Sequence, residues 1–301
     1  GRLRWQESSL DVSDLNVALG TSEVRRLSLA FDWGAGDHYE IRTDAAIIEC
    51  GEVYPWLALL PGLSGLREDI SDLQGNVEIT GFGLSGRISD PLNWNLHADS
   101  RLNHMVITTT FLEEPIRIRL GKLKAEESAT QAPGGTVLRV EDLQASTGSN
   151  RLMTSGEIRL APADIALDLS LTAESIDWNE IQTLSDRLSR RRPTEGRPVK
   201  GRIGLHAEAF KIDRYDFHPL VAEAVLTPGG TTMAIERADL CGIVLIGRLT
   251  FAGGRLNAYI VPVADRFCRS SNRFCRSGCG VSTGTKSIAR GLPLTSAPLR
   301  L

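Results

Sequence analysis

The sequence contains no apolar segment long enough to cross a membrane as a helix. Its longest apolar stretch, Val53 to Leu66, is interrupted by Pro55, Pro61 and Gly62, whereas a bilayer span needs about 20 residues. No signal peptide opens the chain, and position 1 is glycine instead of methionine. We therefore expect a fragment of a longer protein, with any targeting segment or anchor upstream of Gly1.

Cysteine is also scarce, with five residues in 301. Cys50 and Cys241 stand alone in the body of the chain, which excludes a disulfide framework and leaves the redox compartment open. The other three lie in the tail with C-x6-C-x3-C spacing. Structural zinc sites need four ligands, usually in closely spaced pairs. We expect no metal and no cofactor.

The chain lacks an excess of charge of either sign. It carries 34 basic and 37 acidic residues, giving a formal net charge of -3. Without a basic field, nucleic acid is a poor candidate partner. A hydrophobic content of 42% is typical of folded globular proteins.

Catalytic motifs are missing as well. His97 and His206 are expected on polar strand faces, without a serine or cysteine nucleophile nearby. The glycine-rich stretch 81–86 lacks the lysine of a phosphate loop and precedes no helical pattern, so a turn or bulge explains it better. Paired acidic motifs are not found either. We predict that the protein is not an enzyme.

What the sequence does contain is apolar–polar alternation with a period of two. From Ile165 to Glu174, odd positions are apolar and even positions are mostly polar, which is typical of a strand with one dry and one wet face. The alternation recurs near residues 27–33, 94–99, 116–120 and 201–209. It predicts a mainly β fold: an elongated, antiparallel, twisted sheet.

Only two short helices are expected. The first covers about Glu52 to Leu60 and the second runs from Trp178 to about Arg191. Asp177 would be the N-cap of the second helix, and Glu180 would complete a capping box.

Each helix leads through a polar linker to a strand that we expect to begin at a glycine, Gly75 or Gly201. Two further strands are expected to begin at Gly156 and Gly247. Because the intervals are unequal, we interpret the pattern as a loose repeat without a strict period.

The composition changes abruptly near the end of the chain. From Arg266 onward there are seven basic residues, no acidic residue and no alternation. We expect residues 1–265 to form the β segment. Residues 266–301 are expected to be a disordered or out-of-frame tail, basic and rich in serine and cysteine.

A sheet with one apolar face must cover it with a second sheet, with helices or with lipid. The predicted helices are too few to cover five or more strands. A self-packed sandwich and a lipid-lined groove both remain open, and the frequency of β architectures alone favours the sandwich.

Residues 165–251 resemble the C-terminal region of AsmA-like proteins of Gram-negative bacteria, relatives of TamB and YhdP, and the resemblance as a whole covers roughly residues 27 to 263. The matching segments are 167–173, 176–178, 201–207, 222–228, 238–243 and 247–251. Residues 94–99 and 156–160 fit the same family less distinctively. The resemblance implies an open β-groove whose apolar floor carries phospholipid acyl chains across the periplasm.

On this basis we predict a non-enzymatic periplasmic protein for phospholipid transport or outer-membrane biogenesis. The full-length protein would be tethered to the inner membrane, with acyl chains and envelope proteins as partners. The alternative is a structural β-sandwich that supports envelope assembly without lipid. The predicted groove-wall residues are Leu27, Leu29, Phe31, Trp94, Leu96, Leu167, Leu169, Leu171, Ile203 and Leu205.

Overall fold

The computed structural model describes residues 1–34, 37–57, 69–87, 95–127, 135–161, 163–181, 198–252 and 255–263. Trp94 and the predicted tail, 266–301, lie outside them. The elements are β1 (Arg2–Gln6), β2 (Ser9–Leu19), β3 (Ser22–Asp32), β4 (His38–Glu49), α1 (Cys50–Leu57), β5 (Ile70–Arg87), β6 (Asn95–Thr109), β7 (Ile116–Glu127), β8 (Thr136–Thr147), β9 (Asn150–Leu160), β10 (Ile165–Asp177), β11 (Val199–Ile212), β12 (Tyr215–Phe217), β13 (Leu220–Thr227), β14 (Gly230–Leu240), β15 (Ile243–Ala252) and β16 (Arg255–Val263).

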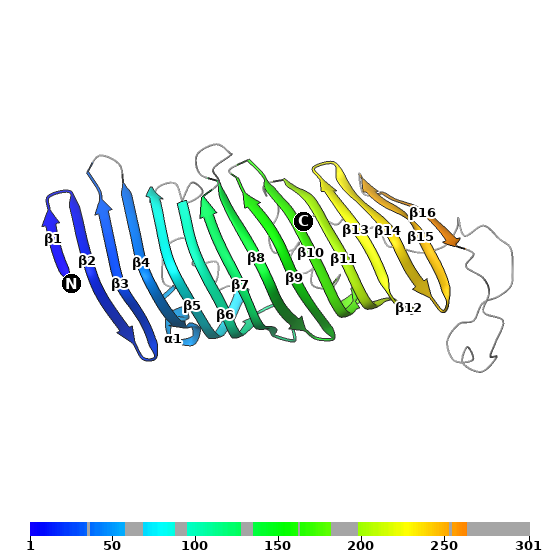
Figure 1. The fold of residues 1–301 in the computed structure, drawn as a ribbon, viewed down its shortest axis with the longest axis horizontal. Helices are drawn as coiled ribbons and strands as arrows, with labels where there is room; N and C mark the ends of the chain where they lie inside the picture. Colours follow the sequence, from blue (N-terminus) through cyan, green and yellow to red (C-terminus); the bar gives the residue numbers. More distant parts are fainter. Residues whose placement is uncertain are drawn as a thin grey trace.

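All sixteen strands belong to one open sheet (Figure 1). Neighbours in the sheet follow the order of the chain, except that the short β12 pairs only with β11. Adjacent strands are antiparallel apart from β10 and β11, which run parallel. The predicted elongated, mainly antiparallel fold is confirmed, and within the described residues no second sheet packs against the first.

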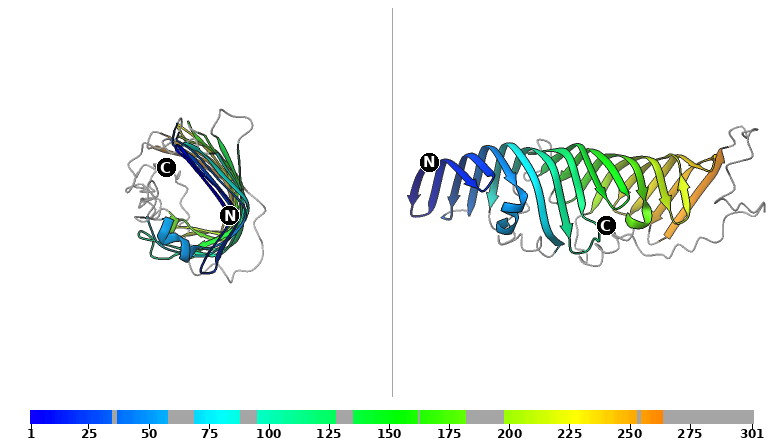
Figure 2. Two further views of the ribbon diagram at one scale, coloured as in Figure 1. Left: turned by 90° about the vertical axis from the view of Figure 1, so that its left-hand side faces the viewer. Right: turned by 90° about the horizontal axis from the view of Figure 1, so that it is seen from below.

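The sheet is bent across its width. Seen along its long axis it forms a trough, and α1 lies on the concave side (Figure 2). We call this side the concave face and the opposite side the convex face.

β-Bulges keep apolar side chains on the concave face where their spacing in the sequence is uneven. In β2 the register shifts by one residue between Val12 and Leu15, and Asp14 between them has a φ of 55°. His104 in β6 and Asp142 in β8 lie at similar shifts, with φ of 49° and 48°. Without the extra residue, side chains three positions apart would point to opposite faces.

Both expected helices are present in the described residues. α1 begins two residues earlier than predicted, at Cys50, and the predicted residues 58–60 lie outside the described part. The second helix begins at Trp178 as predicted and is described to Ile181. The Asp177 carboxylate accepts the backbone N–H of Asn179 at 3.0 Å, which confirms the N-cap.

The prediction that strands begin at glycines is wrong. Gly75, Gly156 and Gly247 lie inside β5, β9 and β15, and Gly201 is the third residue of β11. At Gly156 and Gly201 a Cβ would overlap a backbone carbonyl of β10, and both have positive φ. These glycines therefore mark places where adjacent strands approach too closely for a side chain.

Within the described residues, none of the helices is long and apolar enough to span a bilayer.

Candidate functional site

Nine of the ten predicted groove-wall residues are described, and the strand register places all nine on the concave face. Leu169 pairs with Ile203 across the parallel junction, and Leu171 pairs with Leu205. Side chains at paired positions point to the same face of a sheet. The structure therefore brings these four leucine and isoleucine side chains into one continuous patch.

Two rows of paired apolar residues connect the predicted positions across the sheet. The first row, across β1 to β6, is Leu3, Val12, Leu29, Ile41, Leu84 and Leu96. The second row, across β5 to β11, is Phe82, Ala98, Ala125, Leu138, Ile158, Leu167 and Gly201. Phe82 and Leu84 are two residues apart on β5, so both rows lie on one face.

Sequence reasoning missed several members of these rows, including Ile41, Leu84, Leu138 and Ile158. The signal that could have found them is alternation, which is present at 39–42 and at 156–160.

The nine described wall residues are all half-buried. By contrast, Ala173 and Ala207 on the same face are only 2% and 0% exposed. Ile181 of the second helix packs against the cluster that contains both alanines. Ala125 and Val140, also on this face, are 3% and 5% exposed without belonging to a cluster that contains a helix residue. The helices therefore cover one part of the apolar face, and the wall residues keep part of their surface accessible.

The first helix covers the concave face in the same way. Cys50, at the start of α1, is 5% exposed and clusters with Leu102 and Met105 of β6. Leu73 and Val77 of β5 pack against this cluster. Burial and then the charge of Glu49 raise the pKa of the Cys50 thiol, so it acts as an apolar packing group.

Aromatic residues form the end of the concave face at β1 to β4. Trp5 and Trp33 lie with ring centroids 5.3 Å apart, and Phe31 stacks on Tyr39 at 6.4 Å. Trp5 is 67% exposed, whereas Tyr39 is 5% exposed. Burial raises the pKa of the Tyr39 phenol to about 12. The signal that could have found Trp5 is the alternation of Leu3 and Trp5 with Arg2, Arg4 and Gln6.

The convex face carries the polar side chains and contains several ion pairs. Across β7, β8 and β9, Glu126 pairs with Lys124 at 2.6 Å and with Arg139 at 3.0 Å. Arg139 also lies 3.6 Å from Glu157. The hydrogen bond from Lys124 lowers the pKa of the Glu126 carboxyl. A solvated face of this kind needs no further covering.

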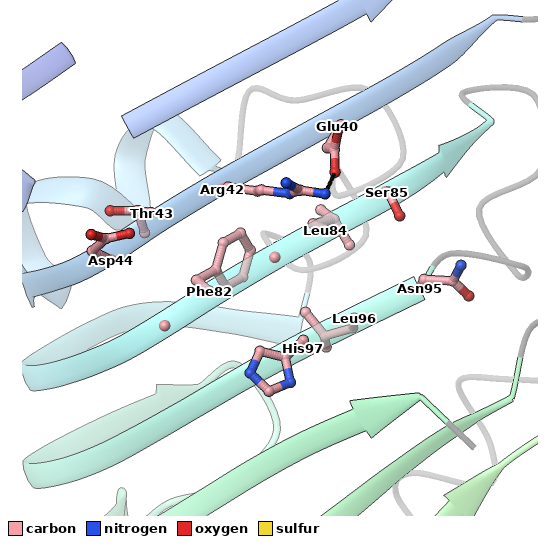
Figure 3. A pocket seen from close by; sticks show the side chains of 12 residues that line it. Glu40, Arg42, Thr43, Asp44, Phe82, Leu84, Ser85, Asn95, Leu96 and His97 are labelled. Carbon is pink, nitrogen blue, oxygen red and sulfur yellow. Dashed lines mark ion pairs between the residues drawn. The ribbon is translucent and has the colours of Figure 1, made fainter. Parts of the chain in front are cut away.

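A shallow depression of about 400 Å³ lies over β4, β5 and β6 (Figure 3). Arg42, Gly83 and His97 occupy paired positions across it, and Arg42 forms an ion pair with Glu40. Gly81 has a φ of 69° at a register shift of β5. The glycine-rich stretch is thus a bulged strand, and the phosphate-loop geometry of a helix N-terminus is absent from it.

Within the described chain, no three histidine, cysteine or acidic side chains gather as metal ligands. Comparison with protein-family models, curated proteins and solved structures finds no significant match. The concave apolar face is therefore the candidate functional site on its geometry alone.

Proposed function

We propose that the concave face binds lipid acyl chains, in the manner of the AsmA-like proteins that the sequence resembles. The observation that carries this proposal is the pair of continuous apolar rows across β1 to β11, whose members include the half-buried Leu29, Leu96 and Leu167. Apolar surface of this extent is a recognised mark of a binding face.

The chemistry of such a face favours hydrocarbon without strong selection of one chain. Each buried CH2 contributes about 0.8 kcal/mol, so affinity would accumulate with chain length. Leu169, Leu171, Ile203 and Leu205 carry no hydrogen-bonding groups on their side chains, so they would not discriminate among headgroups. Binding would involve no covalent step, and the protein would act without enzymatic activity.

In this proposal the protein works in the periplasm, tethered to the inner membrane in its full-length form. It would contribute to phospholipid transport or outer-membrane biogenesis. Its partners would be phospholipids and other envelope proteins.

Native extraction followed by mass spectrometry tests the proposal. We expect phospholipid to copurify with the protein, and Leu169→Asp to reduce the bound amount roughly tenfold, because a charge on the wall is costly to desolvate. Ser170→Asp is the matched control, because Ser170 is the next residue on β10 and points to the convex face. Thermal unfolding of both variants would show whether the sheet remains folded.

A folded wild-type protein without phospholipid would overturn the proposal. That result would instead favour a structural module that supports envelope assembly without lipid.

A further inference from the structure

Several residues of one segment recur 128 positions later in another, for example at 20 and 148 and at 52 and 180. The repeated positions include Val12 and Val140, Asp14 and Asp142, Leu15 and Leu143, Gly20 and Gly148, Ala45 and Ala173, Ile48 and Ile176, and Glu52 and Glu180. In the structure the first segment is β2, β3, β4 and α1, and the second is β8, β9, β10 and the helix that begins at Trp178. The interval of 128 positions therefore holds to within one residue for the bounds of these strands and for the starts of the two helices, although most residues between the repeated positions differ.

The two segments share backbone geometry. The register shift between Val12 and Leu15 in β2 recurs between Val140 and Leu143 in β8. Equivalent bulges with equivalent residues indicate that both segments build one structural unit twice.

In the first unit, Glu52 of α1 bonds to the turn between β2 and β3. Its carboxylate accepts the backbone N–H groups of Thr21 at 2.8 Å and Ser22 at 2.9 Å, and also both hydroxyl groups. The Ser22 hydroxyl oxygen in turn accepts the backbone N–H of Glu49, the last residue of β4, at 2.9 Å. One carboxylate thus fixes the start of the helix to a turn about thirty residues earlier.

In the second unit, Glu180 repeats these contacts. Its carboxylate accepts the backbone N–H of Ser149 at 3.2 Å and the side-chain amide of Asn150 at 2.6 Å. The Asn150 carbonyl oxygen accepts the backbone N–H of Asp177, the last residue of β10, at 2.8 Å. Glu180 is therefore not the capping-box partner predicted from the sequence. We call the two arrangements the Glu52 latch and the Glu180 latch.

Glycines in the two turns make room for the latches. Gly20 has a φ of 59° and Gly148 a φ of 55°. A Cβ on Gly20 would overlap the Glu52 carboxylate, and a Cβ on Gly148 would overlap that of Glu180. The hydrogen bonds from Thr21 and then Ser22 lower the pKa of the Glu52 carboxyl.

Each latched helix packs on only one half of the concave face. We define the helix-packed half by the side chains that cluster with Cys50 or Ile181, which are Leu73, Val77, Leu102, Met105, Ile118, Leu123, Leu143, Leu152, Ala173, Ile176, Leu205, Ala207, Phe210, Phe217, Leu220, Ile235, Ala238 and Leu245. Leu205, a predicted groove-wall residue, therefore belongs to this half. We define the distal half by Ile41, Leu84, Leu96, Leu138, Leu167, Leu169 and Ile203. These distal side chains are all half-buried, as are Leu73, Val77 and Ile118 of the helix-packed half. The most deeply buried members of the helix-packed half are Ala207, Ala173 and Ala238, which are 0%, 2% and 3% exposed.

We propose that Glu52 and Glu180 are positioning residues, which hold two equivalent helices on the helix-packed half and so direct acyl chains to the distal half. This inference rests on the proposed function and adds to it the path that the lipid takes. Leu29, Leu96, Leu167 and Leu169 line this path, and Ala173 and Ala207 lie beneath the helix instead.

Hydrogen exchange tests the latch without lipid. We expect Glu52→Gln to speed amide exchange in α1 roughly tenfold, because hydrogen bonds to a charged acceptor are stronger than those to a neutral amide. Glu23→Gln is the matched control, since Glu23 lies beside the same turn but pairs with Arg25 at 2.9 Å. Unchanged amide exchange in Glu52→Gln would contradict the role of Glu52 in holding α1.

Photo-crosslinking with a diazirine fatty acid tests the path. In the wild-type protein we expect adducts on peptides that contain Leu84, Leu96 and Leu169. In the Glu52→Gln, Glu180→Gln double variant, we expect at least about a threefold gain of adducts on peptides that contain Val77 and Ala207, because the helices no longer cover that half. An unchanged melting temperature would separate this shift from general unfolding.

The outcomes distinguish the two proposals. Adducts spread equally over both halves of the wild-type face would overturn the inference and leave lipid binding standing. A complete absence of adducts would sink the proposed function, while the exchange experiment would still decide whether the latches hold the helices.

Discussion

The side-chain oxygen of Asn150 accepts the backbone N–H of Asp177 at 2.8 Å, joining the start of β9 to the end of β10. Asn150 is 2% exposed, and its amide also donates to Glu180. A polar side chain this deeply buried is tolerated because its hydrogen bonds are made within the protein. Loss of this contact should therefore destabilise the second repeated unit.

We predict that Asn150→Ala destabilises the protein by about 1–3 kcal/mol, because it leaves the part-buried Asp177 N–H without this acceptor. Asn150→Ser should cost clearly less, since Ser22 performs the same role in the first unit. Urea unfolding of both variants measures the difference. Equal losses for alanine and serine would show that the two units do not share this chemistry.

Gly20→Ala should loosen α1 as well as strain the turn. The left-handed backbone costs a non-glycine residue about 1 kcal/mol, and the new methyl would displace the Glu52 carboxylate. Gly81→Ala provides the control, because Gly81 also has a positive φ but a Cβ added there would meet no atom within 4 Å. Hydrogen exchange in α1 should rise for Gly20→Ala alone. A matching rise in Gly81→Ala would mean that strain, and not the Glu52 contact, controls the helix.

Gly201→Ala should disrupt the parallel junction of β10 and β11. The added methyl would overlap the backbone carbonyl of Leu167, which cannot rotate away as a side chain can. We expect a loss of about 2–3 kcal/mol, in the range of overpacked cores. Gly204→Ala on the same strand should change stability by less than about 1 kcal/mol, because its nearest neighbour lies at 3.9 Å. Thermal unfolding compares the two, and similar losses would contradict the role of close approach at Gly201.

The Glu52 latch should weaken in acid. The pKa of Glu52 is lowered from 4.5 in the folded protein, so folding is favoured by the ionised form. Its contribution is fully present above the unfolded pKa and is lost as the pH falls through the lower folded pKa. Amide exchange in α1, corrected for the intrinsic rate, should therefore accelerate below pH 4.5. The same acceleration in Glu52→Gln would assign the effect to other carboxyl groups.

Local sequence patterns predict individual elements well. The alternation from Ile165 to Glu174 is confirmed as part of β10, and Trp178 begins a helix as expected. Both follow from interactions within a few residues, namely side-chain alternation and capping by Asp177. The repeat at 128 positions is also present in the sequence. The predicted strand starts gave only a loose repeat, because they are not the positions that recur at this interval. The recurring positions include the glycine and the glutamate of each latch.

The sequence by itself determined that the chain forms strands with one apolar and one polar face, because alternation is a property of each strand alone. The tertiary structure decided that these strands form one open sheet, that β10 and β11 run parallel, and that bulges at Asp14, His104 and Asp142 keep the apolar residues together. Backbone N–H and C=O groups pair equally well with many partner strands, so the choice of neighbour depends on long-range packing. The tertiary structure also decided which half of the concave face the helices cover, because Glu52 and Glu180 accept hydrogen bonds from residues about thirty positions earlier in the chain.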